Sequence, residues 1–317
     1  MKKKILTCLI FAAVILPIFS EQKIRVGVLN GPSCIPAAYM MENDRIINEV
    51  PVSYEKYADV QALLPKILKG EIDIGFMPAN VAAKVYSTSN KALLCCAITG
   101  NGNLALISKN KNVKRFSDLK GKTIAVAGQG ATPEYMFRYL LEKNELIINE
   151  KDGVTLSFSV PTAQIVPQLI SGKIDYAVVP EPFVTIAKAK SKDIDVCIDL
   201  QSEYEYFAGE GKIYPLTVMV ASKKFINENR RLMELFLSAY EEAFMWTEAN
   251  PIAAGKLCEK QDLGLAAGIV SSAIPRSNYT FITGEELQPK VEELLSIFLS
   301  FDASSIGNSL PAKDFYY

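Results

Sequence analysis

The chain contains one short sequence pattern twice. Residues 69–84 read KGEIDIGFMPANVAAK, and residues 171–188 read SGKIDYAVVPEPFVTIAK. A constant offset of 102 positions pairs Gly70 with Gly172, Ile72 with Ile174, Asp73 with Asp175 and Pro78 with Pro180. In each copy the glycine follows an apolar helical pattern and is typical of a helix end, and the apolar run after it predicts a strand. The repeat indicates two similar structural units, and we expect each aspartate to stabilise its own unit.

Each copy belongs to a longer alternation of strands and helices. Asp59 and Thr132 are placed to cap two of the helices at their N-termini, and Thr162 is placed to open a third. Strands that alternate with helices in this way form parallel sheets with right-handed crossovers. Because the opening strand pattern recurs at Thr123, we expect an α/β protein with two lobes and not one larger sheet. The predicted strands are 23–29, 50–57 and 71–77, then 122–128, 154–160 and 173–179.

Two extended apolar runs, at 99–110 and 211–225, connect the predicted lobes. The residues that follow have helical patterns, one of them starting at Asn227, and no third strand–helix repeat. We therefore expect a helical C-terminal tail packed on lobe 1, with two crossover strands acting as a hinge beside a cleft. The expected division is a signal peptide at 1–20, lobe 1 at 21–103, lobe 2 at 104–213, and the second part of lobe 1 at 214–317.

The first twenty residues have the features of a secretory signal peptide. Three lysines at 2–4 precede an uncharged apolar segment at 5–19. This segment is too short to span a bilayer, which takes ~20 apolar residues, and an N-terminal membrane anchor is the alternative. Cys8 lies too early for lipoprotein cleavage. We expect cleavage after Ser20 and an exported, periplasmic protein, with membrane association left open.

The composition excludes several classes of function. Removing residues 1–20 leaves 31 basic against 35 acidic residues, a net charge of −4, which gives no electrostatic case for nucleic acid. The five remaining cysteines include no CxxC pair and are no disulfide framework. Cys95 and Cys96 fall in a strand pattern, so we expect them on opposite faces. Because the chain has no histidine, it lacks the commonest general base and catalytic metal ligand. We expect no catalytic residue, metal or cofactor.

Ligands of open α/β sheets bind outside the carboxyl ends of the strands. Four predicted strand-to-helix turns lie there, at 30–36, 77–80, 128–133 and 180–183. If both lobes turn these ends inward, the N–H groups at the helix starts point into one cleft. They supply hydrogen bonds and a partial positive charge without any charged side chain. The GxG at 128–130 is a weak dinucleotide motif, because a proline stands where the third glycine is needed.

Several residues in or near these turns are candidates for ligand contact. Glu181 could accept hydrogen bonds from an amino group, or it could be a helix-dipole or surface carboxylate. Tyr204 and Tyr206 could stack on a planar ligand, or they could simply pack. Asn101 and Asn103, beside the first connection, are possible polar contacts or turn formers. The predicted ligand-binding residues are Asn30, Ser33, Cys34, Met77, Asn80, Asn101, Gln129, Thr132, Glu181, Tyr204 and Tyr206.

The chain resembles the periplasmic substrate-binding proteins of ABC importers. The features that carry the resemblance are the signal peptide, the paired lobes, the repeated G-x-I-D, the PEPF at 180–183 and the ending SLPAKDFYY. The group most similar is the nitrate, sulfonate, taurine and thiamine-precursor (NMT1/THI5-like) family, over nearly the whole mature chain. The resemblance implies a type II periplasmic binding protein fold that closes on one small molecule and delivers it to a permease with its ATPase. Its ligand loops match 33–34, 77–80, 129–132 and Glu181, where no Arg or Lys lies.

We therefore expect a monomeric solute receptor and not an enzyme. The neutral loops favour a small heteroaromatic or amine-bearing organic solute over an inorganic anion. Enzymes of thiamine-pyrimidine or menaquinone synthesis share this fold, but the export signal and the absence of histidine count against that function. A sensory receptor for a membrane kinase is a further alternative, which co-purification with a permease or a kinase would distinguish.

Overall fold

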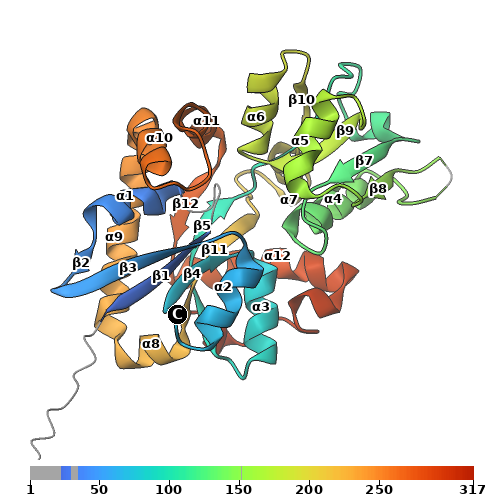
Figure 1. Ribbon diagram of the computed structural model, residues 1–317. Helices are drawn as coiled ribbons and strands as arrows, with labels where there is room; N and C mark the ends of the chain where they lie inside the picture. The colour runs from blue at the N-terminus through green and yellow to red at the C-terminus, as the bar shows by residue number, and fades with distance from the viewer. Residues whose placement is uncertain (1–22, 30–34, 151) are drawn as a thin grey trace, which may run out of the picture.

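The computed structural model describes residues 23–29, 35–150 and 152–317. The predicted signal peptide, and the part of the first predicted turn at 30–34, lie outside the described residues. The described chain forms two lobes, each built on its own β-sheet with helices on both faces (Figure 1). The two predicted α/β lobes are therefore present.

The larger lobe contains a sheet with a parallel centre and antiparallel edges. β1 pairs in parallel with β3 and β4, and β11 runs antiparallel between β4 and β5. In spatial order the strands are β12 (Tyr279–Ile282), β5 (Leu93–Asn101), β11 (Pro215–Ser222), β4 (Ile74–Met77), β1 (Ile24–Leu29), β3 (Val50–Tyr57) and β2 (Ile46–Ile47).

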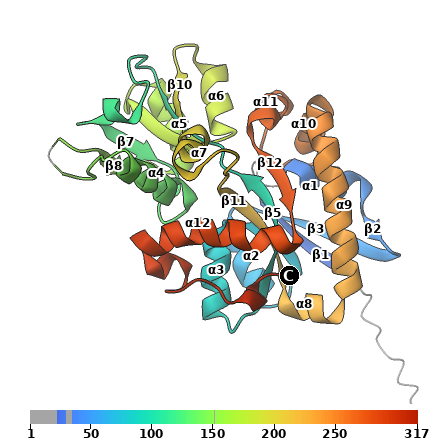
Figure 2. The same cartoon turned by 180° about the vertical axis from the view of Figure 1, so that it is seen from behind.

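Helices cover both faces of this sheet, and the C-terminal tail supplies most of them (Figure 2). Cys95 and Cys96 are buried on β5 in two different apolar clusters, which confirms that they point to opposite faces. One face packs on α2 (Val60–Leu68), α3 (Ala79–Thr88) and α12 (Leu287–Phe301). The other packs on α1 (Ile35–Asn43), α9 (Arg230–Ala249), α10 (Pro251–Lys260) and α11 (Ala267–Ala273), with α8 (Lys223–Glu228) beside them.

The smaller lobe has a sheet of five described strands. Its strands, in spatial order, are β10 (Asp195–Asp199), β6 (Leu104–Ser108), β9 (Tyr176–Pro180), β7 (Thr123–Val126) and β8 (Thr155–Ser157). Its helices are α4 (Thr132–Lys143), α5 (Thr162–Ile170), α6 (Phe183–Lys190) and α7 (Leu200–Ala208). β7 pairs in parallel with β8 and β9, just as β1 does with β3 and β4. The repeat in the sequence is therefore a repeat of topology.

The repeated glycines end equivalent helices in the same way. Gly70 follows α2 with φ +70°, and Gly172 follows α5 with φ +73°. The N–H of Gly172 donates to the Leu169 carbonyl at 3.2 Å, and the next N–H, of Lys173, donates to Gln168 at 2.9 Å. The same pair of bonds closes α2. This is a Schellman end, which needs a residue in the left-handed region and so favours glycine.

The repeated aspartates differ in their surroundings. Asp73 is 4% exposed and binds Arg25 of β1 through the Arg25 backbone N–H at 2.9 Å and its guanidinium at 2.9 and 2.6 Å. It therefore ties β4 to β1 within its own lobe, as expected. Asp175 is exposed at the equivalent position.

Two sequence predictions about helix starts are wrong. Asn227 lies inside α8, which the Ser222 hydroxyl caps by accepting a hydrogen bond from the Phe225 N–H. The long helix expected to start at Asn227 is α9, which begins later, at Arg230, with Asn229 as its N-cap. Thr132 is the first residue of α4, and Ala131 is its N-cap. The predicted cap at Asp59 is confirmed, since its carboxylate accepts from the Ala62 N–H at 2.9 Å.

The chain crosses between the lobes in two places that touch each other. The first crossing is Gly102 and Asn103, between β5 and β6, and the second leads from α7 to β11. The Gly102 N–H donates to the carbonyl of Tyr214 at 2.9 Å. A Cβ atom on Gly102 would lie 2.1 Å from the Tyr214 ring, so no larger residue fits there without displacement. The two segments thus form one narrow connection.

We expect Gly172→Ala to lower the free energy of unfolding by about 1 kcal/mol, because alanine disfavours a positive φ. A Cβ atom at Gly172 would meet nothing within 4 Å, so the loss would come from the backbone alone. Urea unfolding measures it. Gly268→Ala is the matched control, because Gly268 lies in α11 with equally open space and alanine is the better helix former. Equal stability of Gly172→Ala and the unsubstituted protein would contradict the assignment.

Candidate functional site

A cavity of about 260 Å³ lies between the two lobes. It is bordered by the carboxyl ends of parallel strands from both sheets, because Leu29 ends β1, Met77 ends β4 and Pro180 ends β9. The lining residues are Leu29, Met77, Pro78, Thr99, Gly100, Asn101, Asn103, Ala127, Gly128, Ala131, Thr132, Pro133, Thr162, Pro180, Glu181, Leu216, Thr217, Ser277 and Tyr279. Three of the four predicted turns therefore meet at one cavity.

The predicted ligand-binding residues divide into three groups. Four of them line the cavity: Met77, Asn101, Thr132 and Glu181. Four others do not line it: Asn80, Gln129, Tyr204 and Tyr206. The remaining three, Asn30, Ser33 and Cys34, lie outside the described residues. Residues missed by the sequence reasoning include Thr162, Ser277 and Tyr279. Thr162 starts a helix after a strand and could have been found by that rule, whereas Ser277 and Tyr279 come from the tail, whose sequence pattern gave no such signal.

The two tyrosines are placed away from the cavity. Tyr204 is 1% exposed, packs edge-on against Tyr214 with ring centroids 5.4 Å apart, and donates its hydroxyl to Glu293 at 2.9 Å. It helps to join α7 to α12. Tyr206 is 79% exposed and contacts Phe207. One side of α7 faces the core and the other faces solvent, and neither ring lines the cavity. Tyr204 therefore packs in the core, which was the alternative to stacking on a ligand.

Glu181 lines the cavity with its carboxylate already bonded. Its Oε2 accepts from the Thr185 N–H at 3.1 Å and the Thr185 hydroxyl at 2.7 Å. Its Oε1 accepts from Nε of Arg276 at 2.9 Å. Arg276 belongs to the short helix η3 (Ile274–Arg276) of the tail, so this ion pair connects the two lobes on one side of the cavity. Nη2 of Arg276 also donates to the Thr185 hydroxyl at 2.6 Å.

On another side of the cavity the lobes meet through α3 and α4. The Asn80 side chain donates from Nδ2 to the carbonyl of Gly130 at 3.2 Å. Tyr135 of α4 donates to Asp302 of the larger lobe at 3.0 Å. Burial and this hydrogen bond raise the pKa of Tyr135 to about 12, so the phenol stays protonated at neutral pH. The structure therefore shows the lobes in contact on both sides of the cavity.

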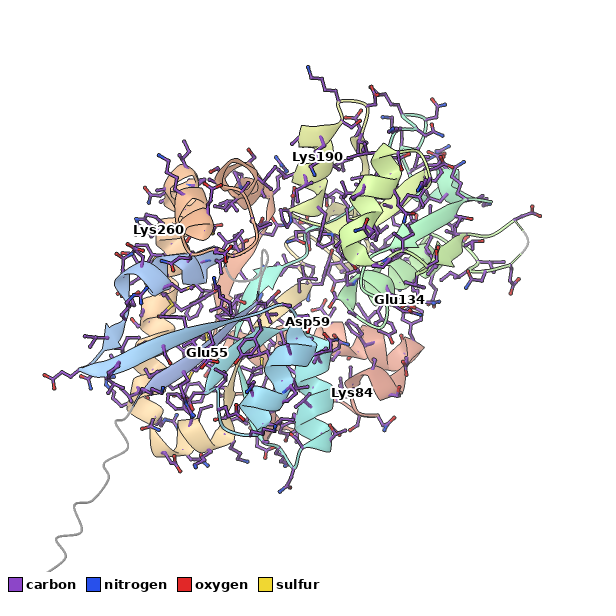
Figure 3. All side chains as sticks on the ribbon, in the orientation of Figure 1. Glu55, Asp59, Lys84, Glu134, Lys190 and Lys260 are labelled. Carbon is purple, nitrogen blue, oxygen red and sulfur yellow. The ribbon has the colours of Figure 1, made fainter. Side chains whose placement is uncertain are left out.

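The start of α4 contains its own carboxylate. Glu134, the third residue of the helix, accepts from the Gly130 N–H at 2.8 Å and from Nε of Arg138 at 2.7 Å. Figure 3 labels Glu134 at the side of α4 near the larger lobe. This carboxylate lies near the positive end of the helix dipole and accepts from an N–H group of the loop that leads into α4. The loop before α4 is thus already bonded to an internal anion.

Three polar atoms of cavity-lining residues are buried and have no hydrogen-bond partner among the described residues. They are Oδ1 of Asn101, Oδ1 of Asn103 and Oγ of Thr132. The Thr132 hydroxyl is available because Thr132 does not cap its helix. Unsatisfied buried polar atoms in a cavity are positions where a ligand can bind.

The described residues contain no cluster of three or more His, Cys, Asp or Glu side chains that could hold a metal ion. Within the same part of the chain, no helix is both long and apolar enough to cross a membrane.

The chain is similar to several solved structures, and periplasmic binding proteins are among them. The chain is similar to the structure of an ABC transporter from Parabacteroides distasonis, with a TM-score of 0.79 and 23% identity over 93% of this chain and 99% of that one. The aliphatic sulphonate binding protein SsuA of Escherichia coli gives a TM-score of 0.72 and 16% identity, covering 92% and 93%. The nitrate-binding protein NrtA of Synechocystis PCC 6803 gives a TM-score of 0.64 and 13% identity, over 93% of this chain and 87% of that one. The fold is that of type II periplasmic binding proteins.

The family model of the NMT1-like family matches residues 20–260, more than half of the chain. The chain belongs to the NMT1-like family. A search of curated proteins found no matching relative.

We expect Arg276→Ala to lower the free energy of unfolding by roughly 1–3 kcal/mol, because it leaves a buried carboxylate without its cation. The Glu181 side chain is 3% exposed, whereas that of Arg276 is 52% exposed. Glu181→Gln should cost less, because water can solvate the freed guanidinium. Denaturant unfolding of both variants measures the difference. Lys290→Ala, which removes an exposed pair with Glu286, is the control and should change little. Equal losses for Arg276→Ala and Glu181→Gln would argue against a buried charge at Glu181.

Proposed function

We propose that this protein is the extracytoplasmic solute-binding component of an ABC importer, which captures a small organic molecule between its lobes. The observation that carries the proposal is the cavity at the carboxyl ends of both parallel sheets, bordered by two lobes that a narrow double connection joins. Membership of the NMT1-like family and the likeness to sulphonate- and nitrate-binding proteins support it.

Binding and closure are coupled in this mechanism. A ligand that contacts both lobes binds the closed form more tightly than the open form, so it shifts the population toward closure. The bonds between Arg276 and Glu181 and between Asn80 and Gly130 form only when the lobes are close. They add to the stability of the closed form without contacting the ligand. The closed form is the one we propose to be recognised by a membrane permease with its ATPase.

We propose that the protein acts outside the cytoplasm, as its predicted signal peptide indicates, and that it works as a monomer. An enzyme on the same fold is disfavoured by the chemistry of the cavity. The described lining residues include no lysine and no cysteine, and their one carboxylate, Glu181, already accepts three hydrogen bonds. A sensory receptor would use the same cavity with a different membrane partner.

The protein purified from bacterial cells should bind a small molecule and become more compact on binding. Native mass spectrometry identifies the bound mass, and X-ray scattering of ligand-free and ligand-loaded samples measures the radius of gyration. Ala131→Trp should abolish binding, because Ala131 lines the cavity and the indole would fill it. Tyr206→Ala is the control, because Tyr206 is exposed and distant from the lining. No binding by the unsubstituted protein would refute the function, and binding without compaction would refute closure.

A further inference from the structure

We propose that the ligand of the cleft is uncharged at neutral pH and presents N–H or O–H donors to Asn101, Asn103 and Thr132. The inference rests on the proposed function and specifies the class of ligand. It follows from three features of the cavity: the charges around it are already neutralised, its unpaired atoms are mostly acceptors, and the rest of its wall is largely apolar.

A cationic ligand would find no free carboxylate among the described residues of the wall. Glu181 is the one acidic residue in the described lining, and both of its oxygens have protein partners. A ligand ammonium would have to compete for Glu181 with Arg276, whose guanidinium also donates to the Thr185 hydroxyl. Burying an ion that lacks a partner is costly, so the cavity disfavours a cation.

An anionic ligand would find no cation in the described lining, which includes neither Lys nor Arg. Helix starts can bind anions through free N–H groups. At α4, however, the Glu134 carboxylate already holds the Gly130 N–H, and Arg138 in turn pairs with Glu134. At the start of α4, a sulfonate or nitrate would therefore lie beside a carboxylate.

The unpaired atoms of the wall select for donors on the ligand. The Asn103 side chain is oriented by its own bond, because Nδ2 donates to the carbonyl of Ser277 at 3.1 Å. Its buried Oδ1 is therefore left as an acceptor, and Oδ1 of Asn101 is likewise buried without a partner among the described residues. The Thr132 hydroxyl can accept or donate. A ligand that lacks donors would leave these atoms buried and unsatisfied, which a binding site rejects strongly.

The remaining wall favours a compact, partly apolar molecule. Leu29, Met77, Ala127, Pro133 and Leu216 line the cavity, whose volume of about 260 Å³ limits the ligand to a small size. An uncharged heterocycle or amide with two or more N–H or O–H groups fits this combination of walls.

The first test exposes the purified full chain to a small-molecule extract of bacterial cells, removes unbound compounds by desalting, and identifies the retained mass by native mass spectrometry. The expected compound is uncharged and carries at least two donors. A retained anion or cation would overturn the inference while leaving the proposed function intact. If nothing is retained, the proposed function fails and the inference fails with it.

Calorimetric titration with methanesulfonate and with nitrate provides a direct probe of anions. We expect no saturable binding of either anion at millimolar concentration. Saturable binding of one of them would show that the cleft accepts an anion and would overturn the inference.

Substitutions then test the donor contacts with the retained compound. Thr132→Val keeps the shape but removes the hydroxyl, so affinity should fall about tenfold. Thr88→Val is the matched control: it makes the same change at an exposed residue of α3 that does not line the cavity and whose hydroxyl donates to the Lys84 carbonyl at 2.8 Å. Its affinity should stay within about twofold of the unsubstituted protein. Unchanged affinity in Thr132→Val would contradict the assigned contact.

Discussion

The contact between Gly102 and the ring of Tyr214 is the constraint on which the arrangement of the lobes depends. One crossing segment passes so close to the other that only a glycine fits, and a backbone hydrogen bond of 2.9 Å joins them. Tyr214 is fully buried, which raises the pKa of its phenol, so the ring stays neutral within its apolar surroundings. Because the two crossings are held together, the lobes are connected at one place and can approach each other elsewhere.

The position of this connection determines what the cleft contains. In the larger lobe β1 lies between β3 and β4, and in the smaller lobe β7 lies between β8 and β9. Equivalent strands therefore end at the same edge of each sheet. The connection turns the carboxyl ends of β1 and β4 toward those of β7 and β9, and the cavity forms where they meet. The position of the cavity and the strand ends that border it are thus consequences of one topology used twice.

The electrostatics of the cleft are set by pairs of residues that are distant in sequence or one helical turn apart. Arg276 of the larger lobe forms an ion pair with Glu181 of the smaller lobe. Within the smaller lobe, Glu134 pairs with Arg138 and accepts a hydrogen bond from the Gly130 N–H. Both carboxylates therefore act on the protein itself. What remains for a ligand is a neutral wall with a few unpaired oxygens, which separates this cavity in chemical character from a site built for a free anion.

Local sequence patterns determined the elements and the duplication. Gly70 and Gly172 follow apolar helical patterns, and period-2 apolar runs form strands, so the repeated helix–strand units could be predicted. The opposite faces of Cys95 and Cys96 and the turns at the strand ends were predictable for the same local reasons. Only the tertiary structure decided which residues pair. Glu181 forms an ion pair with Arg276, Tyr204 donates a hydrogen bond to Glu293, and the Thr132 hydroxyl has no partner among the described residues. Local backbone preferences act over a few residues, whereas a hydrogen bond or ion pair between residues about ninety positions apart exists only after the lobes have packed.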